Sequence, residues 1–538
     1  MVQTVGAGQG GGPKTMNHLF DCNCMLGRRT LYTPLGQPTT ATELLAEMDR
    51  LGIAEALVYH GMAFDGHPWE GNQRLMQEIA GQPRLHPCWI LLPTTGEMPP
   101  PNRLVAEMKA QGVRAARMCP VQHRYQFTEA NVGDLLAALE AARIPLLVDF
   151  SMVSWSEEKT DWRSLDHLCA RYPNLPFIVV GEGMAAPRRV FPLWRRHANL
   201  LLETSYYQTH QGLSDVATRF GADKLLFGTA MPVRAGGPPL MLLRYDFLNE
   251  ADREAIGGGN LRRLLRGAFG GDGWRAEPPP AVSSHVTDLP PHPIIDSHTH
   301  LGTWFSTYIH AGEADGLIRS MDRLGIQKMS LIAFDAIGPD MPGGNDRTAA
   351  AMRAYPGRFL GYATVDPNEP EKITPELERC FKQLGFHGIK FHCDLHGVPA
   401  DHDKYSPALE YADAHNLPVL IHGVITERML KTYPRAQFLS AHVGGWDGRS
   451  PHHAVELSRD YPNIHLELCL SRVIGGVMEK LVEIAGADRI VFGTDAPLMD
   501  PGYQLGRVLT AKISPEDKEK ILYRNAVKLF HLVERGEC

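Results

Sequence analysis

The chain has 538 residues, 43% hydrophobic and 21% charged, which is too long for one ordinary domain and predicts two domains, each with its own core. A net charge of -7 gives no reason to expect a nucleic acid partner, and no apolar run approaches the roughly 20 residues of a membrane span. The nine cysteines include no CxxC pair and no signal peptide is recognised, so we expect a cytoplasmic protein without zinc knuckles or a disulfide framework.

The order of the chain predicts four segments. Residues 1–15 are rich in glycine and are expected to be a flexible tail. Residues 16–269 alternate strand and helix patterns and form a first domain. Proline and glycine are dense in residues 270–292, which predicts a linker. Residues 293–538 form a second domain.

Eight short apolar runs, each followed by a helical pattern, recur in the second domain. The runs are Ile294–His298, Lys328–Phe334, Phe359–Val365, Gly388–Cys393, Pro418–Gly423, Gln437–His442, Ile464–Cys469 and Ile490–Asp495. Buried parallel strands separated by amphipathic helices have this pattern. We therefore predict an α/β fold, a (β/α)₈ TIM barrel. A doubly wound sheet is the alternative, but it would not bring polar residues from all the strand ends to one centre.

The first domain repeats this pattern. Phe227–Pro232 matches Phe492–Pro497 at an offset of 265 residues, and Asp21 matches Asp296 at an offset of 275. Insertions in loops between shared strands produce such a drifting offset. The chain is therefore predicted to be two tandem (β/α)₈ TIM barrels.

The first strand of the second domain ends in two histidines, His298 and His300, separated by one residue. Alternate side chains of a strand point to the same face, so both imidazoles are expected to lie together. Such a pair is suited to binding a metal ion.

Other strand ends of the second domain add His422, His442 and Asp495. Active sites of TIM barrels lie at these ends. Histidines with one carboxylate suit Zn²⁺ or a similar divalent ion, with Mn²⁺ or another ion as alternatives. We expect the ion to activate a water molecule, Asp495 to contact the ion and accept the proton, and His442 to orient the water or shuttle the proton.

Three further residues are candidates for binding substrate. Lys390 and His392 share one face of the fourth strand, and Arg472 follows the seventh. Lys390 is expected to bind a substrate carboxylate or, alternatively, to carry a carbamate that bridges two metals. For His392 the alternative is a structural role. For Arg472 the alternative is an arginine on the protein surface.

The His-x-His pair, the two later histidines and Gly493–Pro497 together resemble the amidohydrolase superfamily. Tyr355–Phe359 and Arg524–Phe530 add to a resemblance to its amidohydrolase-related branch, which contains aminocarboxymuconate semialdehyde decarboxylase. The resemblance is strong over residues 293–535 and covers 16–268 in outline. It implies one divalent ion, often zinc, held by four residues, with a fifth as the catalytic histidine. The implied ligands are His298, His300, His422 and Asp495, and the implied catalytic histidine is His442.

The first domain lacks every one of these ligands. Asn23 and Met25 replace the paired histidines, and the three other positions hold Asp149, Gly181 and Ala230. We therefore expect a pseudoenzyme barrel that packs against the active one. The competing hypothesis is a metal-free site built from Arg117, Asp149 and Cys119.

Together these features predict a metal-dependent hydrolase that acts on a small-molecule amide or lactone in the second domain. The alternative is nonoxidative decarboxylation of a small unsaturated or aromatic carboxylic acid by the same residues. A second alternative is a binding scaffold without catalysis. The expected partners are a small-molecule substrate and the other barrel of the same chain, with no nucleic acid and no membrane, and assembly into a homo-oligomer stays open.

Overall fold

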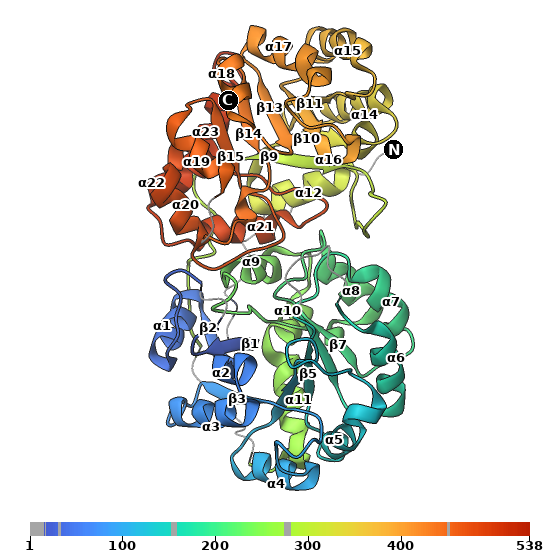
Figure 1. Cartoon of the computed structure of the whole chain (residues 1–538), viewed down its shortest axis with the longest axis vertical. Helices are drawn as coiled ribbons and strands as arrows, with labels where there is room; N and C mark the ends of the chain where they lie inside the picture. The colour runs from blue at the N-terminus through green and yellow to red at the C-terminus, as the bar shows by residue number, and fades with distance from the viewer. Residues whose placement is uncertain are drawn as a thin grey trace, which may run out of the picture.

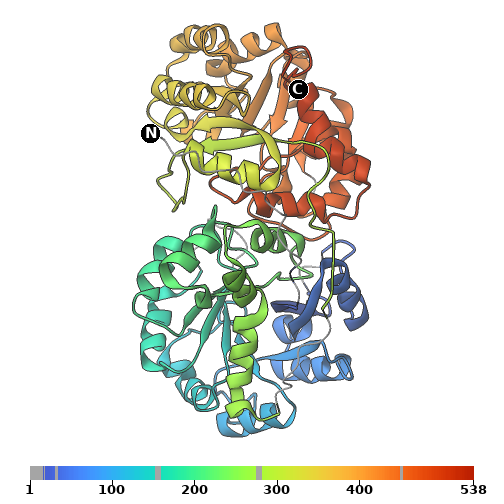
Figure 2. The same cartoon turned by 180° about the vertical axis from the view of Figure 1, so that it is seen from behind.

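The computed structural model describes residues 16, 18–30, 34–151, 159–273, 281–448 and 452–537. The tail predicted at residues 1–15 and part of the predicted linker, residues 274–280, lie outside this range. Figures 1 and 2 show two bodies of alternating strands and helices, one above the other along the long axis.

Each body contains a parallel sheet of eight strands in strictly sequential order. The strands of the first sheet are β1 Leu19–Leu26, β2 Ile53–His60, β3 Leu85–Ile90, β4 Ala115–Met118, β5 Leu146–Asp149, β6 Phe177–Val180, β7 Leu200–Glu203 and β8 Leu225–Leu226. The strands of the second sheet are β9 Ile294–Leu301, β10 Ile326–Ala333, β11 Phe359–Thr364, β12 Gly388–His392, β13 Pro418–His422, β14 Gln437–Ser440, β15 Ile464–Glu467 and β16 Ile490–Val491. Backbone bonds from the first strand to the segment after the last strand, such as Ser297 N to Phe492 O at 2.9 Å, close each sheet toward a barrel. The prediction of two tandem (β/α)₈ TIM barrels is confirmed.

Helices cover the outside of both sheets. Those of the first body are α1 Ala41–Leu51, α2 Gly61–Asp65, α3 Pro68–Glu78, α4 Pro101–Ala110, α5 Glu129–Ala141, α6 Trp162–Arg171, α7 Pro187–Trp194, α8 Gly212–Phe220, α9 Gly237–Tyr245, α10 Glu250–Glu254 and α11 Asn260–Gly267. Those of the second body are α12 Ala314–Leu324, α13 Phe334–Ile337, α14 Met341–Ala354, α15 Pro370–Lys382, α16 Cys393–His396, α17 Ser406–His415, α18 Glu427–Thr432, α19 His453–Asp460, α20 Val477–Ala485, α21 Pro501–Leu509, α22 Pro515–Glu519 and α23 Asn525–Leu529. None of the helices among the described residues is long and apolar enough to cross a membrane.

Local sequence explains where these elements begin and end. Helix α1 begins at a capping box in which Thr40 and Glu43 satisfy each other's backbone N–H groups, and it ends at Gly52, whose φ of 78° suits glycine. The strands are buried on both faces, since helices cover one face and the barrel interior the other.

A buried carboxylate closes each barrel in the same way. Asp21 accepts bonds from the hydroxyl and the backbone N–H of Thr229, at 2.5 and 3.1 Å. Asp296 accepts the same two bonds from Thr494, also at 2.5 and 3.1 Å. The two barrels therefore share these buried hydrogen bonds as well as the order of their strands.

The loop after β7 of the first barrel is buried against the second barrel. Gln208 O accepts a 2.7 Å bond from Asp500 N, and Gln211 N donates a 3.0 Å bond to the Asp500 carboxylate. Helices α9 and α21 pack closely at Gly506. A Cβ added to Gly506 would lie only 2.7 Å from Gly237 O, which is too close for a larger residue there. The expected contact between the barrels within one chain is thus observed.

Asp500 makes this contact sensitive to pH. Burial and the nearby Asp246 raise the pKa of Asp500 to about 7. A raised folded-state pKa contributes stability below the unfolded value of about 4, and that stability is lost as pH rises to about 7. We expect Asp500→Asn to reduce the fall in unfolding free energy between pH 5 and pH 8 by on the order of 2 kcal/mol.

Thermal unfolding of metal-free protein at both pH values, compared with Asp488→Asn, measures this effect. Asp488 is the control because its carboxylate is 63% exposed and pairs with Lys520 on the surface. An unchanged pH dependence in Asp500→Asn would contradict the assignment.

Candidate functional site

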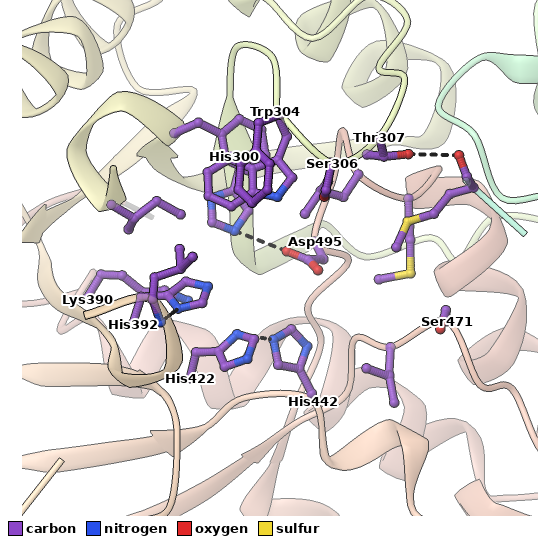
Figure 3. Close-up of a pocket in the computed structure, with 18 residues that line it drawn as sticks. His300, Trp304, Ser306, Thr307, Lys390, His392, His422, His442, Ser471 and Asp495 are labelled. Carbon is purple, nitrogen blue, oxygen red and sulfur yellow. Dashed lines mark hydrogen bonds and ion pairs between the residues drawn. The ribbon is translucent and has the colours of Figure 1, made fainter. Parts of the chain in front are cut away.

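A cavity of about 480 Å³ opens at the carboxyl ends of the strands of the second barrel. Figure 3 shows six titratable side chains directed into it from β9, β12, β13, the segment after β14 and the segment after β16. They are His300, Lys390, His392, His422, His442 and Asp495. Aromatic and aliphatic side chains form much of the remaining wall. The cavity lies where the strand ends predict an active site.

Three of the predicted metal ligands converge beside this cavity. His300 Nε2 is 3.1 Å and His298 Nε2 is 3.6 Å from Asp495 Oδ1. All three residues are buried, and one ligand atom of each lies within 4.8 Å of the others. Two imidazoles and a carboxylate at this spacing fit a divalent metal ion.

His422, the fourth predicted ligand, is not part of this cluster. Its Nδ1 is 3.0 Å from His442 Nε2, and its Nε2 is 3.3 Å from a carboxylate oxygen of Asp394 at the rim. The ring is half-buried and faces the cavity. The structure therefore places His422 in the site, paired with His442, and its role as a ligand stays a prediction.

The charge states of these groups suit a cation. Burial would raise the pKa of Asp495, but its bond with His300 and the other nearby histidines hold that pKa below its ordinary value. Burial lowers the pKa of His442 and of His422 to about 4. At neutral pH the site therefore presents one carboxylate and neutral imidazoles, which are the forms that bind metals.

Lys390 lies next to the predicted ligands. Its Nζ is 3.1 Å from His298 Nε2, and burial lowers the pKa of its amine. His392 stacks on His422 with ring centroids 4.1 Å apart. Both residues line the cavity as predicted, whereas Arg472 is not among the described residues that line it.

Glu467 has a role that the sequence did not indicate. One of its carboxylate oxygens is 3.1 Å from His298 Nδ1 and accepts a 3.1 Å bond from His442 N. A carboxylate on Nδ1 selects the tautomer whose Nε2 lone pair is free for a metal. Its counterpart Glu203 in the first barrel makes the same bonds to Gly181 N and Ser205 that Glu467 makes to His442 N and Cys469, but Asn23 stands where His298 does. Glu203 therefore has no histidine to orient, and the contact with His298 is what distinguishes Glu467 from it.

Cys469 is a second residue that sequence reasoning missed. Its Sγ is 3.1 Å from His442 Nδ1 and 3.0 Å from a Glu467 oxygen, and the residue is fully buried. Cys469 follows Glu467 by two positions at the end of β15, so the alternation of side chains along a strand was a signal for it.

Glu467→Gln is predicted to weaken metal binding by 10- to 100-fold, roughly the range seen when such supporting carboxylates are lost. The amide keeps the shape of Glu467 but provides only one acceptor oxygen for its several donors. Titration against a competing chelator measures the affinity. Glu203→Gln is the matched control in the first barrel, and equal losses in the two variants would argue against the orienting role.

In the first barrel, Arg117 on β4 stands where Lys390 on β12 stands in the second. Arg117 is fully buried, donates 2.5 Å to Asn23 Oδ1 and 3.0 Å to an Asp149 oxygen, and stacks 4.0 Å from the Tyr59 ring. The side chains at the ligand positions therefore surround a guanidinium. The clusters of three or more metal-binding side chains found among the described residues both lie in the second barrel.

The backbone of the first barrel keeps the geometry of the second. Ala230 and Asp495 have φ of 56° and 59°, and Gly181 and His442 have φ of 77° and 67°. A left-handed backbone is unusual for residues other than glycine, so its presence at Ala230 as at Asp495 extends the match between the two barrels to backbone geometry. Burial raises the pKa of the Cys119 thiol well above its usual value, which disfavours the thiolate that a metal-free site would need as a nucleophile.

Comparison with known proteins supports the duplication. The Amidohydrolase family model, Amidohydro_2, matches residues 34–267 and again 295–532. A gamma-resorcylate decarboxylase of Polaromonas sp. (strain JS666) is 25% identical over 285 residues, which cover 40% of this chain and 87% of the relative. Another, from Rhizobium radiobacter, is 24% identical over 286 residues, with coverages of 40% and 87%.

A solved structure gives a similar match. The dihydroxybenzoic acid decarboxylase of Polaromonas sp. JS666, with bound manganese and the inhibitor 2-nitroresorcinol, matches at 20% identity and a TM-score of 0.36. The match covers 45% of this chain and 98% of that chain.

These comparisons confirm the resemblance and correct the expected reaction. The two relatives are decarboxylases, which contradicts the prediction of an amide or lactone hydrolase and favours its alternative. The motifs were insufficient because the same ligands support both reactions, and the choice depends on how the cavity wall holds the substrate.

Proposed function

The chain belongs to the Amidohydro_2 family of amidohydrolases, and from this premise we propose that its second barrel catalyses nonoxidative decarboxylation of a small aromatic carboxylic acid. Decarboxylases of aromatic acids among the relatives support the proposal. The first barrel is proposed to be without catalysis of its own. Zn²⁺ remains the proposed ion, with Mn²⁺ as the alternative that one relative's structure contains.

The single observation that carries this proposal is an aromatic wall next to the predicted metal ligands. The Phe334 ring is stacked on His300 at 4.6 Å and an interplanar angle of 7°, and the Trp304 ring lies 4.9 Å from Phe334. Lys390 and Asp495 both line the cavity beside this wall, and Figure 3 shows the two side chains in it. A flat ring that carries a carboxylate matches a wall of aromatic faces beside a buried amine.

Each group of residues in the site has a proposed role. A divalent ion at His298, His300 and Asp495, with His422 as the fourth proposed ligand, would supply a Lewis acid for the oxygens of the substrate. Lys390 binds the substrate carboxylate, and Trp304 with Phe334 orients the ring and excludes water.

Decarboxylation needs a proton at the ring carbon that carries the carboxylate. A C–H bond forms there while the C–C bond breaks, its electron pair stays on the ring and CO₂ leaves. Asp495 is ionised and His442 is neutral at neutral pH, so the proton comes from solvent. Asp495 or His442 is the proposed carrier that takes it up and passes it to the ring carbon, because both line the cavity and His442 is bonded onward to His422.

The proposal is tested with purified protein loaded with Zn²⁺ or Mn²⁺ and given 2,6-dihydroxybenzoate or 5-carboxyvanillate. We expect CO₂ release and, in D₂O, one deuterium at the vacated ring carbon. Tight binding of both acids without turnover would instead support the binding scaffold. Absence of both binding and turnover over a panel of aromatic acids would contradict the proposal.

A further inference from the structure

Among the described residues, one side chain of the first barrel lines the cavity of the second barrel. Met184, in the loop between β6 and α7, is 4% exposed and lines the cavity. It packs in an apolar cluster with Cys469 and Met499 of the second barrel. A residue of the barrel that lacks metal ligands is therefore part of the wall around the proposed substrate.

The first barrel also holds a loop of the second barrel in place. The segment 302–313 follows β9, and four of its residues, 304 to 307, line the same cavity. Arg188 of α7 donates to the backbone oxygens of Phe305 at 2.6 Å and Thr307 at 2.7 Å, and more weakly to Trp304 O at 3.3 Å. The Thr307 hydroxyl donates a 2.8 Å bond back to Met184 O. Hydrogen bonds therefore run from α7 to this loop and from the loop back to Met184, just before α7.

A second set of contacts fixes the later part of this loop. The hydroxyl of Tyr308 donates 2.9 Å to Asp215 and accepts 3.0 Å from Arg219, both on α8. The ring of Tyr308 meets Phe191 of α7 edge to face at 5.4 Å. The loop is therefore bound along its length to two helices of the other barrel.

These contacts connect the first barrel, through the loop, to the proposed catalytic centre. Arg188 fixes the backbone at Trp304, whose ring packs on Phe334, and Phe334 is stacked on His300. A guanidinium that serves three carbonyl groups limits their movement far more than a single neutral bond would.

We propose that the first barrel is a specificity element for the second: Met184 lines the substrate pocket, and Arg188 is a positioning residue for the aromatic wall. The proposal rests on the proposed function for the chemistry of its substrate, an aromatic acid. The ring of the acid lies against Trp304 and Phe334, and Met184 limits the size of its substituents. The positioning role rests on the contacts of the loop with Met184, α7 and α8, and it does not depend on which substrate the site takes.

Amide hydrogen exchange of peptides from segment 302–313 tests the positioning role without any assay of activity. Arg188→Met is expected to speed exchange there at least tenfold. Arg195→Met is the matched control, since Arg195 is exposed at the end of the same helix. Arg188→Lys should restore part of the protection. Equal exchange in Arg188→Met and in the control would overturn the positioning role.

Kinetics with the aromatic acids test the specificity role. Arg188→Met should raise KM about tenfold and change kcat less than threefold, with unchanged metal content. Met184→Ala should shift the ratio of kcat/KM at least threefold toward 5-carboxyvanillate over the smaller 2,6-dihydroxybenzoate. Unchanged KM and selectivity would overturn this role. If the wild-type chain turns over neither acid, the proposed function fails, whereas the exchange experiment still decides whether the first barrel positions the loop.

Discussion

Asp495→Asn is expected to lower kcat/KM for the aromatic acid by at least about 1000-fold without unfolding the second barrel. The amide keeps the size of the carboxylate but is neutral, so it is a poor ligand and cannot carry the proton. His300 Nε2 and His298 Nε2 would lose the charge that now lies 3.1 and 3.6 Å from them. Steady-state kinetics with metal content and circular dichroism on the same samples separate lost chemistry from lost fold.

Asp394→Asn is the control for this variant. Its carboxylate is 75% exposed at the rim and only touches His422, at 3.3 Å. We expect less than a fivefold effect there, because an exposed pair contributes little. If Asp495→Asn kept more than a tenth of the wild-type rate, neither the ligand role nor the proton role could stand.

Much of the fold follows from the sequence because parallel strands buried on both faces leave a clear pattern. The predicted strand Pro418–Gly423 is β13 Pro418–His422, and the predicted Gln437–His442 is β14 Gln437–Ser440. The convergence of His298 and His300 on Asp495 was likewise predictable. It needs only the alternation of side chains along β9 and the rule that the strand ends of a barrel meet.

The rest of the site depends on contacts that no local pattern encodes. Glu467 contacts His298 Nδ1 from a position 169 residues further along the chain, and only the folded structure shows this contact. Met184 meets Met499 from the other barrel, more than 300 residues away in the sequence. Side-chain rotation, which a sequence does not reveal, pairs His422 with His442 and keeps it from the ligand cluster.

Part of the segment predicted to be a linker packs on the first barrel. The Ser284 hydroxyl donates 2.5 Å to Arg50 O, and Thr287 is buried beside Arg244. Proline and glycine content predicts a linker there, but it does not report which surface the segment lies on.

One equivalent of metal per chain is expected in protein purified without added metal or chelator. Only the second barrel has two imidazoles and a carboxylate in one cluster among the described residues. Removal of the ion by a chelator should reduce decarboxylation to below about 1%, and one equivalent of Zn²⁺ or Mn²⁺ should restore it. Elemental analysis of metal content with activity on the same samples makes the measurement.

Two double variants decide which barrel holds the ion. His298→Ala/His300→Ala should contain none, whereas Asn23→Ala/Met25→Ala, at the matched positions of the first barrel, should still contain one. Arg117 explains the asymmetry: a fixed guanidinium bonded to Asn23 and Asp149 satisfies a carboxylate that would otherwise lie at the barrel mouth without a counter-ion. Two equivalents, with one lost in the first variant, would contradict this account and place an ion in the first barrel. Two equivalents lost together would instead favour a carbamate on Lys390, which is 3.1 Å from His298 Nε2 and near enough to bridge two ions.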